Sequence, residues 1–425
     1  MNAVVNDDQY MTHVTDLGES EVVTASEDIV SEKGVMLLPK GAAINKKMLS
    51  KLQQHSLDQQ VDQVITIEDA LDSAQIMEIG QLLLKEHPEF AASQAFLFDR
   101  TMPIRSFGRL RLNTTTRNKL TVCKNQKPEL FEHSMLVAYC CMCVADLMKV
   151  PLIDADDLIT AAMLHDLGMM HLSKEFHDHS AIYTPEQERQ IASHPIIMYQ
   201  ILAKFPEYTT IANLILEHHE HLDGSGYPKA LVGKTSLPSQ ILSATECAIS
   251  VFQKHGYNYT LSVLKTHMAE QFNDKVSKCL IKILNSWHEA SSEFDFPRNY
   301  DDVELLYEKL NTSVTSGAKT LSTLTNPFAS SSAVIHLKQR ISAIQVSLAN
   351  VGLDKLRGAT TLKMTSDDDD LIIEIGDVIQ DSIFQVFDSI RIFRRQLHPE
   401  SKVPSELTAW LKQTEDTLKD CFLGE

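Results

Sequence analysis

Between Glu129 and about Trp287 the apolar residues recur at helical spacing, and no convincing strand interrupts them. Apolar residues three and four positions apart share one face of a helix, so each helix must bury that face against another. The predicted helical segments are 136–147, 155–167, 185–204, 210–220, 237–254 and 262–287. This middle part of the chain is therefore expected to fold as an all-α domain.

The regions on either side of this core have different patterns. Before it, short β-prone runs at 22–24, 35–38 and 64–67 and a short helix at 46–54 predict a small mixed α/β module. Residues 1–20 are polar, and we expect them to be frayed. After the core, a Ser/Thr-rich linker is expected at 312–333, and amphipathic helices at 334–348, 371–396 and 406–422.

The predicted fold is thus mainly α, in four parts. They are a small α/β N-terminal regulatory module at 1–70, a helical linker at 71–120, the all-α core at 121–290 and a helical C-terminal interaction region at 291–425. Neither flank holds a group of residues that could do chemistry. We therefore expect input, docking or dimerisation for the first module. We expect contact with protein partners or homodimerisation for the last region.

Two charged runs in these regions have ordinary interpretations. The acidic run Asp367–Asp370 comes directly before a predicted helix, where carboxylates complement the helix dipole. A basic patch is interpreted as the solvated face of the linker, because a phosphate-facing role would want a glycine-rich loop. Its members are Arg100, Arg105, Arg109, Arg111, Arg117 and Lys119.

Charge and composition exclude several classes of partner. The formal net charge is −18 at pH 7, whereas a nucleic-acid binder needs a basic face. The same charge disfavours an anionic membrane surface, and the most apolar stretch, 137–148, is short for a membrane span. The first residues lack the pattern of a signal peptide. We therefore expect a cytoplasmic protein that binds neither DNA or RNA duplexes nor a membrane. Cys140, Cys141 and Cys143 lack a second pair for a zinc site and are interpreted as small buried side chains.

The adjacent pair His218-His219 is the strongest sign of a binding site. Neighbouring residues on a helix point about 100° apart, so two imidazoles can reach two adjacent points, as two metal ions would require. Gly224 and Gly226 permit unusual backbone dihedrals just after the pair, and Pro228 prevents the helix from continuing.

Other residues of the core could join this pair, namely Glu129, His133, His165, Asp166, His194 and Glu246. Singly, most have an ordinary structural role: Glu129 and His133 could pair on one helix face, and His194 could belong to a helix cap. His165-Asp166 is different, because it ends an apolar helix, where an ionisable pair is expensive to bury unless something binds it.

Taken together, these imidazoles and carboxylates suit iron, manganese, zinc or nickel better than calcium or magnesium alone. The ligands suffice for two metal ions, and for three if Glu129 takes part. A metal pair lowers the pKa of a bridging water and binds a phosphoryl group, so phosphoester hydrolysis is the chemistry that this set favours.

At this point the chain resembles the HD-GYP branch of the HD metal-dependent phosphohydrolases. The resemblance rests on His165-Asp166 with Gly168, on His133 before them, on His194-Pro195 after them, and on the run from His218 to Asp223-Gly224-Ser225-Gly226-Tyr227-Pro228. It implies that the core is a cyclic di-GMP phosphodiesterase that hydrolyses the 3′–5′ phosphodiester with a metal-bridging hydroxide. It also implies two or three divalent metals, commonly iron or manganese.

The resemblance also assigns roles to residues. Asp166 would bridge two metals and, with His165, carry the catalysis, while His133, His165, His194, His218 and His219 would be terminal ligands. Glu246 stands where the family has a ligand Asp, and Glu129 matches the extra carboxylate of three-metal members. The substrate, cyclic di-GMP or a related cyclic dinucleotide, would be bordered by Tyr227, Gly226 and Asp223.

The chain also departs from the family in its expected phosphate-binding cations. Met169 replaces the lysine of His-Asp-x-Gly-Lys, His221 replaces an arginine, and His255-Gly256-Tyr257-Asn258 stands where Arg-Pro-Tyr-Arg is usual. Each lost charge-assisted contact is worth about 1.5–3 kcal/mol. Two alternatives therefore stay open. One is a catalytically weak, metal-bound module that acts as a cyclic-dinucleotide receptor or signalling scaffold. The other is an enzyme for another phosphoester, such as a different cyclic dinucleotide.

Overall fold

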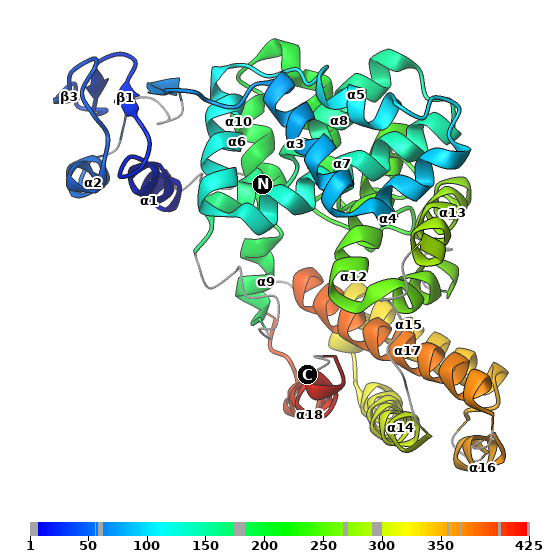
Figure 1. Ribbon diagram of the computed structural model, residues 1–425. Helices are drawn as coiled ribbons and strands as arrows, with labels where there is room; N and C mark the ends of the chain where they lie inside the picture. The colour runs from blue at the N-terminus through cyan, green and yellow to red at the C-terminus, as the bar shows by residue number, and fades with distance from the viewer. Residues whose placement is uncertain are drawn as a thin grey trace. The chain divides into compact units, whose positions relative to one another are not determined.

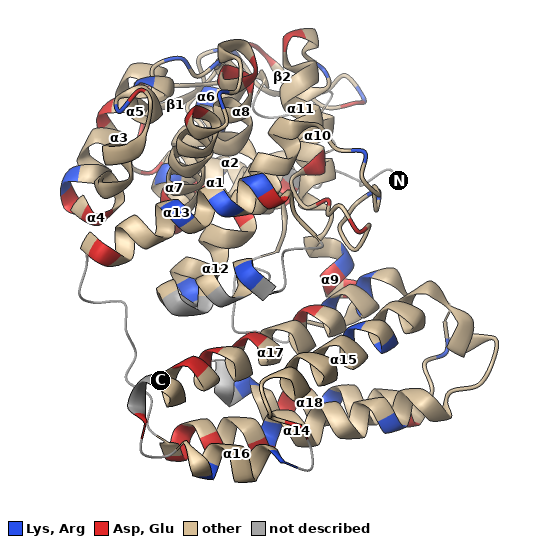
Figure 2. Cartoon of the chain, turned by 90° about the vertical axis from the view of Figure 1, so that its right-hand side faces the viewer, with Lys and Arg blue, Asp and Glu red and all other residues tan. Residues whose placement is uncertain are grey.

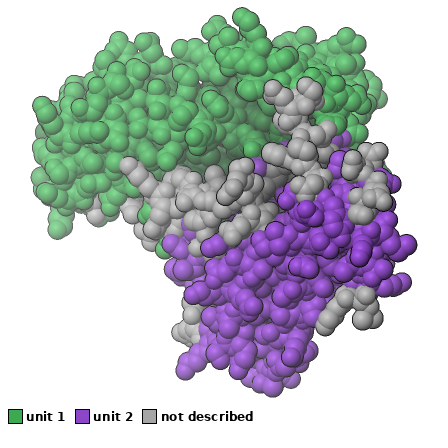
Figure 3. Space-filling model, turned by 60° about the horizontal axis from the view of Figure 1, so that its bottom comes forward, with its two compact units in different colours: residues 1–177, 190–253, 270–292 green, residues 178–189, 254–269, 293–425 purple. Residues whose placement is uncertain are grey.

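The computed structural model describes residues 7–55, 57, 63–173, 183–266, 271–290, 300–354, 357–365, 368–397 and 401–422. The chain divides into two compact units, coloured separately in Figure 3: residues 1–177, 190–253 and 270–292 form the first, and residues 178–189, 254–269 and 293–425 the second. Helices make up most of both units, which confirms the predicted mainly α fold. The boundaries of the four parts expected from the sequence stay predictions.

The N-terminal module pairs its short strands two by two (Figure 1). Strand β1 (Val23–Ala25) is antiparallel to β4 (Ile65–Ile67), and β2 (Ile29–Val30) is antiparallel to β3 (Met36–Leu38). Helix α2 (Lys46–Gln53) begins after Asn45, whose side chain accepts a hydrogen bond from the backbone N–H of Lys47. The strands predicted at 22–24, 35–38 and 64–67 and the helix predicted at 46–54 are confirmed.

The expectation that residues 1–20 are frayed is wrong for the described part, because helix α1 (Asp7–Leu17) lies there. Tyr10, Val14 and Leu17 are fully buried and share one helix face. Helix α1 packs on α2, on α6 (Thr114–Gln126) and on the 3₁₀ helix η3 (Leu167–His171). Polar residues between these three apolar ones conceal the periodicity in the sequence.

Residues 71–126 contribute α3 (Ser73–Glu86), α4 (Pro88–Ala91), the 3₁₀ helix η2 (Ala92–Phe96), α5 (Met102–Phe107) and α6. Helix α3 packs on α5, and α5 and α6 pack on α7 (Pro128–Leu147), which belongs to the core of the same unit. These helices are therefore part of the first unit rather than a separate layer.

The basic residues of this region correct the interpretation of a solvated face in part. Arg109 Nε lies 2.7 Å from Asp156 Oδ1, and Arg117 Nε donates to the Leu71 carbonyl oxygen at 3.0 Å. Lys119 is fully buried. These three members are internal structure, whereas the other three, Arg100, Arg105 and Arg111, are exposed.

The core of the first unit is built from α7, α8 (Leu152–Leu164), α10 (His194–Leu202), α11 (Thr209–Glu217), α13 (Asp274–Ala290) and the first part of α12 (Leu237–Thr266). A 3₁₀ helix, η5 (Pro206–Tyr208), precedes α11. The segment predicted as one helix at 185–204 is two, α9 (Pro185–Ile191) and α10, and the helix predicted at 262–287 begins only at Asp274. Helix α12 is kinked at Gly256, which has a positive φ of 77°.

Helix α7 is the central helix of this core. By length and composition it could cross a membrane, but 78% of the window that meets this test is buried inside the protein. It packs on α5, α6, α8 and α13. Cys140, Cys141 and Cys143 are fully buried on it, which confirms their interpretation as small buried side chains.

The second unit is mainly a helical bundle. Helices α14 (Tyr300–Thr323), α15 (Ser332–Asn350), α17 (Asp369–Gln396) and α18 (Ser405–Phe422) share one apolar core, accompanied by η6 (Phe328–Ser330) and α16 (Gly358–Met364). Side chains of the helices predicted at 334–348, 371–396 and 406–422 build this core. The linker predicted at 312–333 is wrong, because Val314 and Leu321 are buried in the bundle and α14 continues to Thr323.

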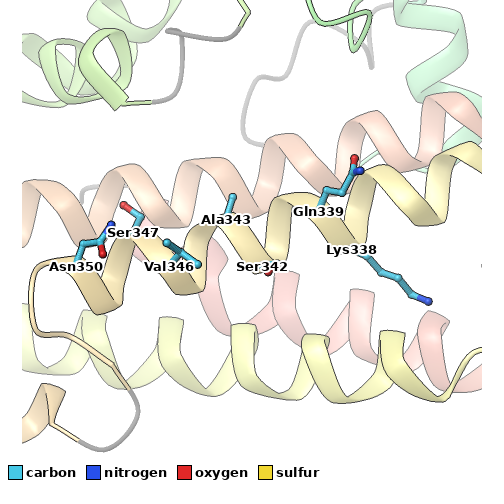
Figure 4. A pocket seen from close by; sticks show the side chains of 7 residues that line it. All are labelled: Lys338, Gln339, Ser342, Ala343, Val346, Ser347 and Asn350. Atoms are coloured by element: carbon cyan, nitrogen blue, oxygen red, sulfur yellow. The ribbon is translucent and has the colours of Figure 1, made fainter.

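The surface of the bundle offers no metal ligands at its described pocket. Seven side chains along α15 line this pocket (Figure 4): Lys338, Gln339, Ser342, Ala343, Val346, Ser347 and Asn350. None of them is a histidine, cysteine or carboxylate. In the view of Figure 2, acidic and basic residues are interspersed along the helices, without one continuous basic face among the described residues.

Candidate metal centre

The predicted ligands lie at helix ends and on helix faces of the first unit. His165 caps the C-terminus of α8, and Asp166 precedes η3 directly. His194 begins α10, where Pro195 is tolerated because the first turn of a helix needs no N–H from it. His218 ends α11, and His219 follows it into the loop. Helix ends thus place these side chains next to one another.

Two groups of four side chains come together. The first, the Glu246 cluster, consists of His133, His165, Asp166 and Glu246. The second, the His219 cluster, consists of Asp166, His194, His218 and His219. In each group, one ligand atom per residue lies within 4.8 Å of all the others.

Asp166 belongs to both clusters, and its two oxygens face different ones. Its Oδ2 lies 3.4 Å from His165 Nε2 and 3.9 Å from His133 Nε2. Its Oδ1 lies 3.1 Å from His194 Nε2 and 3.6 Å from His218 Nε2. A carboxylate with one oxygen toward each group has the arrangement that a bridging ligand needs.

Hydrogen bonds at the far side of the rings fix which nitrogen faces the clusters. The Nδ1–H groups of His165, His194 and His218 donate to the backbone carbonyls of Ala162, Ile191 and Ile215 at 2.7, 2.7 and 2.6 Å. A carbonyl only accepts, so the proton is on Nδ1 and the Nε2 lone pair of the neutral ring points into the cluster. His133 makes the corresponding bond to a side chain, with Nδ1 at 2.7 Å from Gln253 Oε1.

The Glu246 cluster attracts protons to its imidazoles. Burial alone would lower the pKa of His133 and His165, but the neighbouring carboxylates of Glu246 and Asp166 outweigh it and raise both pKa values, that of His165 strongly. Burial would raise the pKa of Glu246, yet His133 and His165 hold it well below its usual value. Glu246 Oε2 is 2.8 Å from His133 Nε2 and 3.1 Å from His165 Nε2, which explains the coupling.

The His219 cluster repels protons. Burial lowers the pKa of His218 to about 4, with a smaller contribution from His165 and His194, and Asp166 only partly opposes this. Burial also lowers the pKa of His219 strongly, and the neighbouring imidazoles of His218 and His194 lower it further. The Nε2 atoms of His194 and His218 nevertheless lie only 3.1 Å apart. Two neutral acceptors that face each other at this distance repel, unless a cation lies between or beside them.

These observations show that the residues present fit divalent metals. Lone pairs of imidazole nitrogen converge on the Asp166 carboxylate, its buried Oδ1 has no hydrogen-bond partner among the described residues, and the nitrogen–oxygen donor set suits transition metals. His133, His165 and Glu246 would hold one ion, His194, His218 and His219 another, and Asp166 both.

Two glycines let the backbone close around the His219 cluster. A side-chain carbon on Gly168 would lie 2.1 Å from the carbonyl oxygen of His194, so only glycine lets η3 approach α10 this closely. A carbon on Gly226 would lie 2.3 Å from the carbonyl oxygen of His219. The loop of residues 218–228 is therefore folded tightly against its own histidines.

The residues predicted to border the substrate lie in this loop. The Tyr227 ring stacks on the His219 ring, with centroids 4.6 Å apart, and is half-buried. Asp223 is exposed, and its Oδ1 accepts a hydrogen bond from the Ser225 N–H at 2.9 Å. Tyr227 is thus adjacent to the metal ligands, whereas Asp223 shapes the turn. Their role toward a substrate stays a prediction.

The structure brings seven of the eight predicted ligands together and leaves Glu129 outside both clusters. Glu129 is exposed in the first turn of α7, so its role as the carboxylate of a third metal stays a prediction. Met169, at the position of the family's lysine, is 9% exposed. The side chains of His255 and Asn258 lie outside the described residues.

Sequence reasoning missed two residues next to the ligands. Ser250 Oγ donates to Glu246 Oε1 at 2.7 Å, and Gln253 Oε1 accepts from His133. Both follow Glu246 on α12 at positions i+4 and i+7, on the same helix face, and this spacing is the signal that could have revealed them.

A helical core that gathers imidazoles and carboxylates around a His-Asp pair defines the class of HD-type metal-dependent domains. Residues 121–262 match the family described as HD domain, and this part of the chain belongs to that family. The run that ends in Gly226-Tyr227-Pro228 is the motif on which the resemblance to the HD-GYP branch rests. An HD domain implies the binding of divalent metal, which the two clusters fit.

Several curated proteins are similar to this segment. Cyclic di-GMP phosphodiesterase PdeB of Borreliella burgdorferi is 27% identical over 137 residues, 31% of this chain and 36% of that protein. 3′3′-cGAMP-specific phosphodiesterase 3 of Vibrio cholerae is 28% identical over 141 residues, 33% and 31% of the two chains. A cyclic di-GMP phosphodiesterase of Thermotoga maritima is 30% identical over 105 residues, 24% and 28% of the two chains. The match spans about a third of the length of each relative.

Proposed function

We propose that this protein is a metal-dependent cyclic di-GMP phosphodiesterase that hydrolyses a 3′–5′ phosphodiester bond. The observation that carries the proposal is the pair of ligand clusters that share Asp166. Two metal sites joined by one carboxylate suit an in-line displacement at phosphorus, where the attacking and leaving oxygens both need stabilisation. The names of the relatives support a cyclic dinucleotide as the substrate class.

The bound metals and the residues of the site would have different roles in hydrolysis. Bound metals would act as Lewis acids toward the phosphoryl group and activate water as the nucleophile. Asp166 holds the two sites in register through its separate oxygens, while the carbonyl-bound Nδ1–H groups of His165, His194 and His218 orient the rings so that Nε2 faces the metal sites. Iron or manganese is proposed on the donor set, which combines imidazole with carboxylate.

The substrate would lie beside the loop of residues 218–228. Tyr227 is held against His219 by ring stacking and by the hydrogen bond from its backbone N–H to the His219 carbonyl oxygen at 2.9 Å. An aromatic ring next to a metal ligand offers a surface on which a nucleobase can stack. Gly226 allows the turn that puts Tyr227 there. We propose a cytoplasmic site of action, with the N-terminal module and the helical bundle as surfaces for protein partners.

A second function, a metal-bound receptor or scaffold with weak catalysis, is favoured by one observation. Met169 replaces the cation that the family offers to phosphate, and it is almost buried. A site that keeps its metal ligands but lacks phosphate-binding cations would bind the dinucleotide through the metals and release it slowly or unchanged.

One assay separates the two functions. The protein would be purified with Mn²⁺ or reduced iron, its metal content measured, and cyclic di-GMP and 3′3′-cGAMP followed by chromatography. Hydrolysis of cyclic di-GMP that disappears in Asp166→Ala is the expected result. Binding without turnover at full metal occupancy would establish the receptor, and turnover of only the second dinucleotide would change the substrate.

A further inference from the structure

Glu246 has one methylene more than the aspartate that the family offers at this position. A longer side chain has an additional rotatable bond, so its carboxylate is less well fixed by the backbone. In this chain, however, both oxygens of the carboxylate have polar partners. Its Oε1 accepts the Ser250 hydroxyl at 2.7 Å, while its Oε2 faces His133 at 2.8 Å and His165 at 3.1 Å.

The Ser250 hydroxyl has an alternative that it does not use. A serine inside a helix commonly donates back to the carbonyl four residues earlier. Ser134 on α7 does this, with Oγ 3.0 Å from the Leu130 carbonyl oxygen. Ser250 instead donates to the side chain four residues earlier, that of Glu246, which is only 6% exposed. Its hydrogen bond is therefore directed at a ligand carboxylate in a site from which water is mostly excluded.

Gln253 supports the neighbouring ligand from the same helix face. Its Oε1 lies 2.7 Å from His133 Nδ1, so the His133 N–H donates to it and Nε2 is left as the acceptor toward the cluster. His133 has no carbonyl partner of the kind that orients His165, His194 and His218 among the described residues. Gln253 is itself exposed, so water can replace part of this bond.

We propose that Ser250 is a positioning residue for Glu246, that Gln253 is a weaker one for His133, and that together they set the metal affinity of the Glu246 cluster. One face of α12 thus supplies the ligand Glu246, the residue that orients it, Ser250, and the residue that orients the neighbouring ligand His133, Gln253. The inference rests on the metal centre of the proposed function, but not on the identity of the substrate.

The test measures Mn²⁺ binding to the full chain without any nucleotide, by equilibrium dialysis with metal analysis. Ser250→Ala is expected to weaken one of two Mn²⁺ sites by about 10–100-fold, the usual effect of removing a group that orients a metal ligand. Ser250→Thr, which keeps the hydroxyl, should retain wild-type affinity. Gln253→Leu should weaken the same site by less than Ser250→Ala does, and Gln253→Glu, which keeps an acceptor oxygen, should restore it.

Ser134→Ala is the matched control, because it removes a buried hydroxyl from the helix of His133 without touching a ligand. It should leave both Mn²⁺ sites intact. The second site also reports folding: a Ser250→Ala protein that still binds Mn²⁺ at the His219 cluster is folded. Unchanged affinity in Ser250→Ala, or an equal loss in Ser134→Ala, would overturn the proposal.

Failure of the proposed function looks different in this experiment. If the wild-type chain binds two Mn²⁺ ions but leaves cyclic di-GMP intact, the proposed phosphodiesterase activity is wrong. The Mn²⁺ affinities of the variants still decide the role of Ser250 in that case. A wild-type chain that binds no Mn²⁺ would overturn the metal centre and both proposals with it.

Discussion

The two ligand clusters share Asp166 but are constructed in different ways. The Glu246 cluster takes His133 and Glu246 from the faces of α7 and α12, where side chains orient them, and His165 from the end of α8, where a backbone carbonyl orients it. The His219 cluster draws on helix ends and a tight loop, and backbone carbonyls and close-packed glycines orient its ligands. The Glu246 cluster therefore depends on side-chain partners for two of its ligands, and the His219 cluster on the path of the backbone.

Their electrostatics differ in the same sense. Two carboxylates against two imidazoles raise the pKa of His133 and His165, whereas one carboxylate against three closely packed imidazoles leaves His218 and His219 with lowered pKa values. A metal ion must displace protons from the first cluster, whereas in the second cluster the lowered pKa values of His218 and His219 leave these two rings without protons to displace at neutral pH. A single chain can thus hold two adjacent metal sites with different proton linkage.

Replacing the shared ligand, Asp166, should have the largest effect, because it should impair metal binding at both clusters. Asp166→Ala removes the oxygens that face both clusters and leaves the imidazoles without a bridging charge. We expect the loss of both bound metals and of hydrolysis, measured by metal analysis and by chromatography of cyclic di-GMP. Ser134→Ala is the control, since Ser134 lies in neither cluster and has no predicted role as a ligand. Retention of two metals by Asp166→Ala would contradict the bridge.

Ligands that belong to one cluster should separate the two sites. Glu246→Ala is expected to lose one metal per chain and His219→Ala the other, because each variant leaves the four side chains of the opposite cluster intact. Metal analysis at graded Mn²⁺ concentrations would measure this. If either substitution emptied both sites, the clusters would have to be treated as one cooperative unit.

A backbone change should act on the His219 cluster alone. In Gly168→Ala the added carbon would lie 2.1 Å from the His194 carbonyl oxygen, so η3 and α10 must separate. We expect a loss of about 1–3 kcal/mol in stability and weaker binding at the His219 cluster only. Thermal unfolding and Mn²⁺ dialysis would test both parts. Gly108→Ala, whose added carbon meets the flexible Met77 side chain at 3.2 Å, should be mild in comparison.

The smallest expected effect is a difference in pH dependence. Raised pKa values keep His133 and His165 protonated in the metal-free protein up to a higher pH than usual, so affinity at the Glu246 cluster should rise as pH rises through neutrality. His218 gains its proton only near its pKa of about 4, so the His219 cluster should show little change over the same range.

Calorimetry in buffers with different ionisation enthalpies would count the protons released at each site. Proton release confined to the variant that keeps the Glu246 cluster, His219→Ala, would sharpen the comparison. Equal release from Glu246→Ala would break it.

Much of the site could be predicted from the sequence, because His133, His165-Asp166, His194 and His218-His219 follow one another on successive apolar helices, where unbound imidazoles and carboxylates are costly to bury. The sequence also suggested Asp166 as the bridge, by family resemblance. It could not show that Oδ2 and Oδ1 face different clusters, because that depends on how η3 packs against α10 at Gly168. The bond of Gln253 to His133 depends in the same way on the approach of α12 to α7, whereas the bond of Ser250 to Glu246 lies within α12 and is signalled by their i, i+4 spacing.

The fold was predictable where apolar periodicity is strong and was missed where tertiary partners decide. Helix α1 and the end of α14 look polar in sequence, yet Tyr10 and Leu321 are buried by elements far away in the chain. Lys119 looked like a surface cation. Its Nζ in fact lies 2.9 Å from His171 Nε2 and 3.7 Å from the centre of the Tyr10 ring, which no local pattern indicates.

The path of the chain limits how this protein can be taken apart. Residues 178–189 and 254–269 belong with the bundle, and each segment adjoins a stretch that bears a metal ligand, His194 after the first and Glu246 before the second. Arg394 holds the first segment by donating to the Tyr183 carbonyl oxygen at 3.0 Å. A truncation after residue 292 would strip both segments of the helices they pack with, so we expect it to disturb the stretches of the first unit that bear His194 and Glu246.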